Sequence, residues 1–92
     1  IGGEEFAVLL PGVTAAEAGG MASRIVAAIA AQPMNIEASA VSVSVSCGFA
    51  DTQVSYDLER LYKAADDAMY GAKAAGRNRA LGFVQLAAIA TR

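Results

Sequence analysis

The most regular feature of the chain is an alternation of apolar and small polar residues over residues 41–50. Valine, cysteine or phenylalanine fills every second position, with serine, glycine or alanine between them. A period of two is typical of a strand that turns one face toward a core. The continuous apolar run at residues 5–10 predicts a second strand, buried on both faces, which Pro11 and Gly12 end.

Apolar residues recur at helical spacing in two other stretches. The first helix begins with a capping box, in which Thr14 and Glu17 each bond the other's backbone amide, and Pro33 ends it. The second begins at Asp57, an acid favoured by the helix dipole, and Gly76 ends it. The predicted buried stripes are Ala18, Met21, Ala22, Ile25, Val26 and Ile29 in the first helix, and Leu58, Leu61, Tyr62, Ala65, Met69 and Ala72 in the second.

Two weaker patterns complete the predicted order of elements. Residues 34–38 favour a short strand, and residues 79–86 favour a last strand. The alanine-rich end, residues 87–92, is open to two interpretations, disorder or a helical extension. The expected order is β-α-β-β-α-β, which belongs to the α+β class.

Size and composition restrict the function classes. Ninety-two residues make one small domain, and a net charge of −2 argues against a general nucleic-acid binder. A single cysteine, Cys47, forms no internal disulfide and alternates with valines, so we interpret it as a core residue in a reducing compartment. We find no apolar run long enough to cross a membrane and no signal peptide. The chain opens inside a motif without an initiator Met, which favours a piece of a longer protein.

The first residues carry the strongest candidate chemistry. Gly2 and Gly3 allow a tight turn whose backbone can approach a ligand closely. Glu4 and Glu5 follow where a strand begins, and carboxylates beside a phosphate are what Mg²⁺ requires. Taken alone, the same four residues also describe an ordinary surface turn.

Charged residues near the end of the second helix are the other candidates. Lys73 and Arg77 are four residues apart and suit a polyphosphate, although the helix dipole alone also favours cations there. Asp66 and Asp67 point about 100° apart on the helix, so they are not expected to share a metal ion. We interpret Asp66 as orienting a neighbouring group and Asp67 as a surface residue.

Three blocks together resemble the GGDEF family, the diguanylate cyclase domains. They are GGEEF at residues 2–6 with the apolar run after it, VSVSCGFA at residues 43–50, and ADDAMYGAKAAGRNR at residues 65–79. The resemblance assigns residues 1–92 to the C-terminal part of a single GGDEF domain. Residues 1–81 match the family, and residues 82–92 form an indistinct tail.

The resemblance implies a partial sheet of the nucleotidyl-cyclase or polymerase-palm type, which is ferredoxin-like. The family's N-terminal helix and its central first strand, which carries a metal-binding acid, would lie before residue 1. The site at which these enzymes usually bind their product, cyclic di-GMP, as an inhibitor would also lie before residue 1. The absent strand would leave two unpaired edges on an apolar surface, which would favour association.

The resemblance also implies an enzyme for the parent protein, which condenses two GTP into cyclic di-GMP and releases pyrophosphate in bacterial signalling. Glu4 and Glu5 would be catalytic and would bind Mg²⁺ or Mn²⁺. Gly2 and Gly3, with Lys73 and Arg77 at the phosphates, would bind substrate.

Catalysis would need a homodimer of GGDEF domains, and the resemblance implies a cytoplasmic protein. An upstream sensory domain or a downstream phosphodiesterase domain in the parent protein would be compatible with the resemblance. The isolated 92-residue chain is expected to be inactive. Two alternatives stay open. One is a degenerate GGDEF module that binds GTP or regulates a neighbouring domain without catalysis, and the other is a structural fragment without a ligand.

Overall fold

The computed structural model describes residues 7–90, so Gly2, Gly3, Glu4 and Glu5 lie outside the described residues. Helices and strands both occur in this range, which confirms the α+β class. The elements are α1 (Ala15–Ala30), β1 (Met34–Ile36), β2 (Ser39–Val41), β3 (Ser46–Phe49), α2 (Leu58–Ala74), β4 (Arg79–Gly82) and α3 (Phe83–Ala90).

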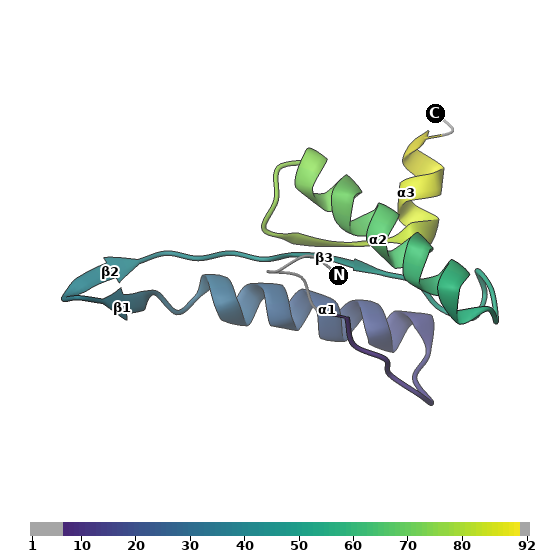
Figure 1. Ribbon diagram of the computed structural model, residues 1–92, viewed down its shortest axis with the longest axis horizontal. Helices are drawn as coiled ribbons and strands as arrows, with labels where there is room; N and C mark the ends of the chain where they lie inside the picture. The colour runs from purple at the N-terminus through teal and green to yellow at the C-terminus, as the bar shows by residue number, and fades with distance from the viewer. Residues whose placement is uncertain (1–6, 91–92) are drawn as a thin grey trace.

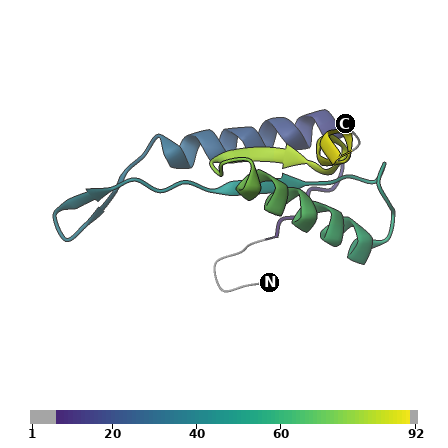
Figure 2. The same ribbon diagram turned by 90° about the horizontal axis from the view of Figure 1, so that it is seen from above.

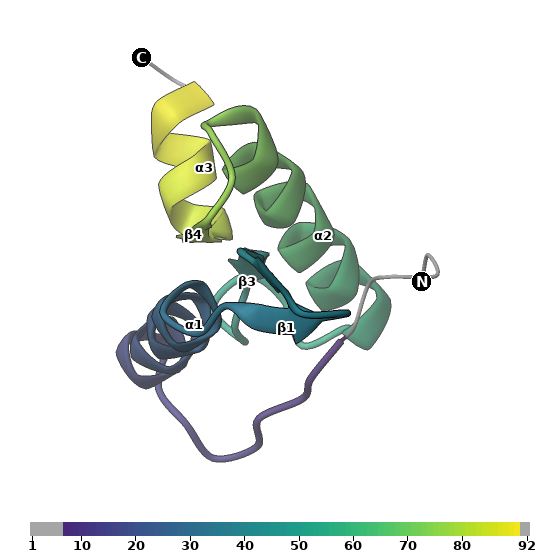
Figure 3. The same cartoon turned by 90° about the vertical axis from the view of Figure 1, so that its left-hand side faces the viewer.

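The centre of the molecule is a pair of parallel strands between helices. Strands β3 and β4 pair with Ser46 opposite Arg79 and Phe49 opposite Gly82, and α2 is the crossover that joins them. Helix α1 lies on one side of this pair and α2 on the other, while α3 packs beside α2 (Figures 1 and 3). The crossover therefore brings the C-terminal end of α2 to the start of β4.

Gly48 sets how closely α2 approaches the sheet. A Cβ added to Gly48 would collide with the carbonyl oxygen of Ala65 and the amide nitrogen of Met69. The backbone of the helix therefore rests directly on the strand, which only glycine permits at this position. The same closeness leaves room only for small side chains on the helix face beneath.

The buried stripe of α2 is consequently made of alanine. Ala64, Ala68 and Ala72 are buried, and Ala68 is 0% exposed. The predicted stripe is confirmed at Ala72, which is buried, and Leu61, Ala65 and Met69 are half-buried. It is wrong at Leu58 and Tyr62, which are 63% and 42% exposed. These two large side chains lie off the buried face, where close backbone contact favours the alanines.

Helix α1 follows its prediction more closely. Ala22 and Val26 are buried, whereas Ile25 of the predicted stripe is half exposed. The capping box is confirmed: the Thr14 hydroxyl accepts from the Glu17 amide at 3.1 Å, and the Glu17 carboxylate accepts from the Thr14 amide at 3.0 Å. The aromatic ring of Phe49 lies against Gly19, which accounts for a glycine inside the helix.

The observed strands are shorter than the sequence pattern predicted. Residues 7–10 form no strand, and Val8 and Leu9 are 76% and 71% exposed, because no described segment pairs with them. Residues 41–50 divide into the end of β2 and all of β3, since residues 42–45 between them have no ladder partner. The predicted last strand ends at Gly82 and continues as α3, so the helical interpretation of the tail is confirmed as far as Ala90.

Strands β1 and β2 form an antiparallel hairpin that projects from the rest of the molecule (Figure 2). Ile36 pairs with Ser39, which leaves a two-residue turn. Both turn residues have positive φ, 49° at Glu37 and 67° at Ala38. This is the backbone of a type I′ turn, built here without the glycine or asparagine that usually fills it.

Candidate functional site

Two of the six predicted site residues fall within the described part of the chain. Lys73 lies in the last turn of α2, and Arg77 lies two residues beyond the C-cap, Ala75. The sequence prediction that they share one end of the helix therefore holds. The other four, Gly2, Gly3, Glu4 and Glu5, are outside the described residues.

The end of α2 is closed by two backbone hydrogen bonds. The amide of Gly76 donates to the carbonyl of Lys73 at 3.3 Å, and the amide of Arg77 donates to the carbonyl of Ala72 at 2.9 Å. Gly76 has a φ of 125°. This is the Schellman arrangement with Gly76 at C′, as the sequence predicted, and it fixes where Arg77 leaves the helix.

The chain then stays in the left-handed region for two further residues. Arg77 has a φ of 64° and Asn78 a φ of 48°. Asparagine tolerates this region, whereas an arginine there is under backbone strain. The Arg79 side chain reaches back across this turn, and its Nε donates to the carbonyl of Arg77 at 3.0 Å.

The end of α2 is a favourable place for an anion-binding side-chain cluster. The Lys73 ammonium lies 5.3 Å from the centroid of the Tyr70 ring, a cation–π distance that directs the lysine along the helix surface. Arg77 and Arg79 are exposed beyond it. Cations at the C-terminal end of a helix are stabilised by its dipole, and lysine and arginine together can bind several phosphate oxygens.

The acids of α2 do not form a second site. Asp67 accepts a hydrogen bond from the Lys63 ammonium, which supports its assignment to the surface and raises the pKa of Lys63. No group of three or more histidine, cysteine or acidic side chains within residues 7–90 is placed to hold a metal ion.

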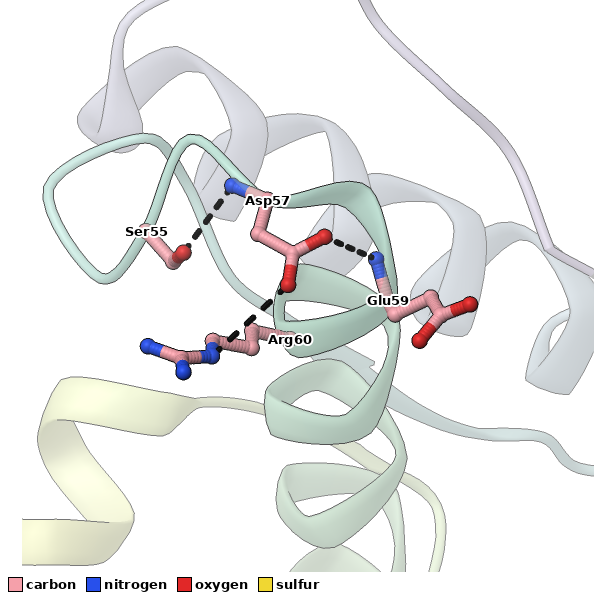
Figure 4. Close-up of polar contacts among 4 residues, drawn as sticks. All are labelled: Ser55, Asp57, Glu59 and Arg60. Atoms are coloured by element: carbon pink, nitrogen blue, oxygen red, sulfur yellow. Dashed lines mark hydrogen bonds and ion pairs between the residues drawn. The ribbon is translucent and has the colours of Figure 1, made fainter.

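The polar residues at the start of α2 are occupied by capping (Figure 4). The Asp57 carboxylate accepts from the Glu59 amide at 3.3 Å and lies 3.7 Å from the Arg60 Nε. The Asp57 amide donates to the Ser55 hydroxyl at 2.9 Å. These contacts fix the helix N-terminus and engage the side chains of Ser55, Asp57 and Arg60.

Two further residues bear on the sequence interpretation. Cys47 is half-buried on β3, and burial raises the pKa of its thiol, as expected of a packing residue. Arg79 was missed as a candidate. Its only sequence signal is its position two residues after Arg77, a spacing that does not reveal a side chain folded back on the turn.

Comparison with known proteins identifies the family to which the chain is similar. Residues 1–79 match the family model described as "Diguanylate cyclase, GGDEF domain". No solved structure gives a significant match to the chain. Within residues 7–90, none of the helices is long and apolar enough to cross a membrane.

Three curated bacterial proteins are similar to the chain over most of its length. Diguanylate cyclase DgcP of Pseudomonas aeruginosa is 43% identical over 79 residues, covering 85% of this chain and 12% of that protein. Response regulator PleD of Caulobacter vibrioides is 37% identical over 84 residues, covering 88% and 18%. Diguanylate cyclase DgcS of Shewanella oneidensis is 42% identical over 80 residues, covering 85% and 25%.

The chain thus spans a quarter or less of the length of each of these three relatives. The mixed helix and strand architecture is consistent with the palm-like fold of these domains. Since the family model covers residues 1–79 of 92, the chain belongs to the GGDEF family of diguanylate cyclase domains.

Proposed function

We propose that this chain supplies the metal-binding turn and the triphosphate-binding helix end of a diguanylate cyclase. Membership of the GGDEF family and the curated cyclase relatives support a role in cyclic di-GMP synthesis at the family level. The family uses GTP and is generally metal-dependent. The observation that supports the proposal is the end of α2, where Lys73 lies in the last turn and Arg77 follows a Schellman cap.

The proposed metal ligands are Glu4 and Glu5. Carboxylate oxygens are the hard donors that Mg²⁺ and Mn²⁺ prefer, and Gly2 and Gly3 before them allow close approach of the backbone to a nucleotide. When bound, the metal would neutralise the triphosphate and lower the pKa of the attacking hydroxyl. Glu5 would assist metal binding or accept the proton of that hydroxyl.

The proposed phosphate ligands are Lys73 and Arg77. In the reaction, each ribose 3′-oxygen bonds to the α-phosphorus of the other GTP, and the bond to pyrophosphate breaks. Negative charge therefore accumulates on the leaving pyrophosphate. A lysine and an arginine at the distal phosphates would stabilise that charge and hold each GTP in line for attack.

Two GTP molecules must meet for this chemistry, so the proposed active form is a homodimer of GGDEF domains with one GTP bound to each. The isolated 92-residue chain is proposed to be inactive, because Glu4 and Glu5 would act with a third acid on a strand that precedes this segment in the family. A sensory domain upstream or a phosphodiesterase domain downstream would fit a signalling protein.

The test is cyclic di-GMP formation by the full-length protein, measured by chromatography after incubation with GTP and Mg²⁺. We expect Glu4→Gln and Glu5→Gln to lower turnover at least about a hundredfold, the scale of losing a charge-stabilising catalytic group. Glu17→Gln removes an exposed acid of the α1 cap and serves as the matched control with full turnover.

Full activity of the Glu4 and Glu5 variants would refute the proposed metal site. Metal-dependent GTP binding without product, in the unsubstituted protein, would favour the degenerate module instead. Failure to bind GTP at all would favour a structural role. Turnover by the isolated 92-residue chain would refute the proposal that it is inactive alone.

A further inference from the structure

We infer that Arg79 is a positioning residue, which braces the left-handed turn after α2 and so fixes the direction in which Arg77 points. This inference rests on the proposed function of Arg77 as a phosphate ligand. It gives a function to a cation that neither the sequence motif nor the family match assigns.

The contacts of Arg79 span the whole turn. Its Nε donates to the carbonyl of Arg77 at 3.0 Å. Its guanidinium also covers Gly76: a Cβ placed on Gly76 would lie 2.7 Å from a terminal nitrogen and 3.5 Å from the Cζ of Arg79. The side chain thus fills the space that glycine leaves empty and bonds to the residue that follows it.

The turn needs such a brace because three consecutive residues have positive φ. The values are 125° at Gly76, 64° at Arg77 and 48° at Asn78. Glycine adopts this region freely and asparagine tolerates it, but arginine has a steric penalty there, so the backbone of Arg77 would relax if nothing held it. The amide of Arg77 is held by Ala72, and its carbonyl is held by Arg79.

The two ends of the turn are anchored separately. The Schellman bonds tie the entry to α2, and the pairing of Arg79 with Ser46 ties the exit to β3. The Arg79 side chain connects these two anchors, because Arg79 pairs with β3 while its Nε bonds to the carbonyl of Arg77 on the far side of Asn78. A phosphate-binding arginine held in this way loses less conformational entropy when it binds, which strengthens binding without another ligand contact.

The rival interpretation is that Arg79 is a third phosphate ligand. Against it, the Nε–H of Arg79 is already committed to the Arg77 carbonyl, and the guanidinium plane covers the turn. By contrast, the Arg77 guanidinium makes no hydrogen bond or ion pair to any other residue from 7 to 90.

A double-mutant cycle distinguishes the two interpretations. In the full-length protein, Mg²⁺–GTP binding is measured by calorimetry for Arg77→Ala, Arg79→Ala and the double variant. We expect Arg77→Ala to weaken binding about tenfold or more and Arg79→Ala about fivefold, the scale of one typical intramolecular hydrogen bond. If Arg79 acts through Arg77, the double variant binds as weakly as Arg77→Ala alone.

Additive losses in the cycle would overturn the positioning function, because they would show that Arg79 contacts the ligand independently. Arg79→Lys is the conservative variant: it keeps the charge but not the Nε–H and planar group, so it should weaken binding as much as Arg79→Ala. Retained affinity in Arg79→Lys would also overturn the inference.

A second measurement does not depend on the ligand. Hydrogen exchange of the Arg77 amide in the same proteins should accelerate about fivefold in Arg79→Ala and Arg79→Lys, while amides in the middle of α2 keep their rates. Unchanged exchange at Arg77 would refute the brace. If exchange accelerates but Arg77→Ala does not weaken GTP binding, the brace stands and the proposed function of Arg77 fails.

Discussion

Gly48 is the residue on which the packing of the central layer depends most. It is the point where the α2 backbone touches β3, at the carbonyl of Ala65 and the amide of Met69. The sequence pattern predicted the alternation of residues 41–50 but gave no reason for glycine rather than another small residue. That reason lies in the helix that covers the strand, whose distance from it no local pattern encodes.

Replacing Gly48 should therefore be far more damaging than replacing a glycine in open space. Gly48→Ala is expected to destabilise the domain by about 3 kcal/mol or more, since the added methyl displaces α2. Gly20→Ala is the matched control, because a Cβ there meets nothing within 4 Å and should stabilise α1 by up to about 1 kcal/mol. Urea unfolding followed by circular dichroism measures both, and equal effects would contradict this account of the packing.

Arg77 and Gly76 show how far single residues could be predicted. The position of Gly76 at the helix end follows from its freedom at positive φ, and the structure confirms it. The left-handed backbone of Arg77 could not be predicted, because arginine has no preference for it. It results from bonds made to Ala72 and Arg79 after the helix has ended.

Helix α1 is the element that the sequence predicted best. Its first turn, its stop before Pro33 and the burial of Ala22 and Val26 all agree with the pattern. Helix starts are predictable because the capping box is local, made by residues three apart. The buried stripe of α2 was less predictable, because it depends on how close a strand distant in sequence approaches.

The capping box of α1 makes a prediction about stability and pH. Thr14→Ala should destabilise the domain by about 1 kcal/mol, whereas Thr14→Ser keeps the hydroxyl and should be close to neutral.

Bonds from the Thr14 amide and hydroxyl lower the pKa of Glu17 below its ordinary value of 4.5. The contribution of Glu17 is therefore present above about pH 4.5 and lost as pH falls through its lower folded pKa.

The corresponding measurement is thermal unfolding of the unsubstituted protein and Glu17→Gln from pH 7 to pH 3. The stability difference between the two should shrink as pH falls below 4.5. A difference that grows toward low pH would show that the carboxylate does not cap α1.

Strands were the least predictable elements. An apolar run such as residues 7–10 meets the local requirements of a strand but forms one only when a neighbouring strand offers its backbone. Residues 79–86 divide between β4 and α3 because the ladder with β3 ends at Gly82. In both cases the missing information is the pairing partner, which lies elsewhere in the sequence or outside the described residues.

On the scale of the whole molecule, the buried core is small for the apolar content of the chain. Its buried hydrophobic members among residues 7–90 are Ala22, Val26, Ala64, Ala68 and Ala72. Larger apolar side chains, including Val8, Leu9 and Ile36, are more than half exposed. Within the same range β3 pairs with β4 alone, so its second edge carries no ladder.

The isolated chain is therefore predicted to associate in solution. Exposed apolar side chains and an unpaired strand edge both favour self-association. Sedimentation velocity from micromolar to near-millimolar concentration should show a weight-average mass that rises above the 9.3 kDa of one chain. A single 9.3 kDa species throughout that concentration range would contradict the prediction.

The central claim is that Lys73 and Arg77 bind the distal phosphates of GTP, and comparison of GTP with GMP tests it most directly. Calorimetric titration of the full-length protein with each nucleotide, with and without Mg²⁺, is repeated for Lys73→Ala and Arg77→Ala. An exposed arginine of α1, Arg24, supplies the control variant Arg24→Ala.

We expect Lys73→Ala and Arg77→Ala to weaken Mg²⁺-dependent GTP binding about tenfold or more, while GMP binding and the Arg24→Ala variant stay unchanged. GTP binding that is unaffected by both substitutions, or equal losses for GTP and GMP, would contradict the claim that the end of α2 binds the distal phosphates.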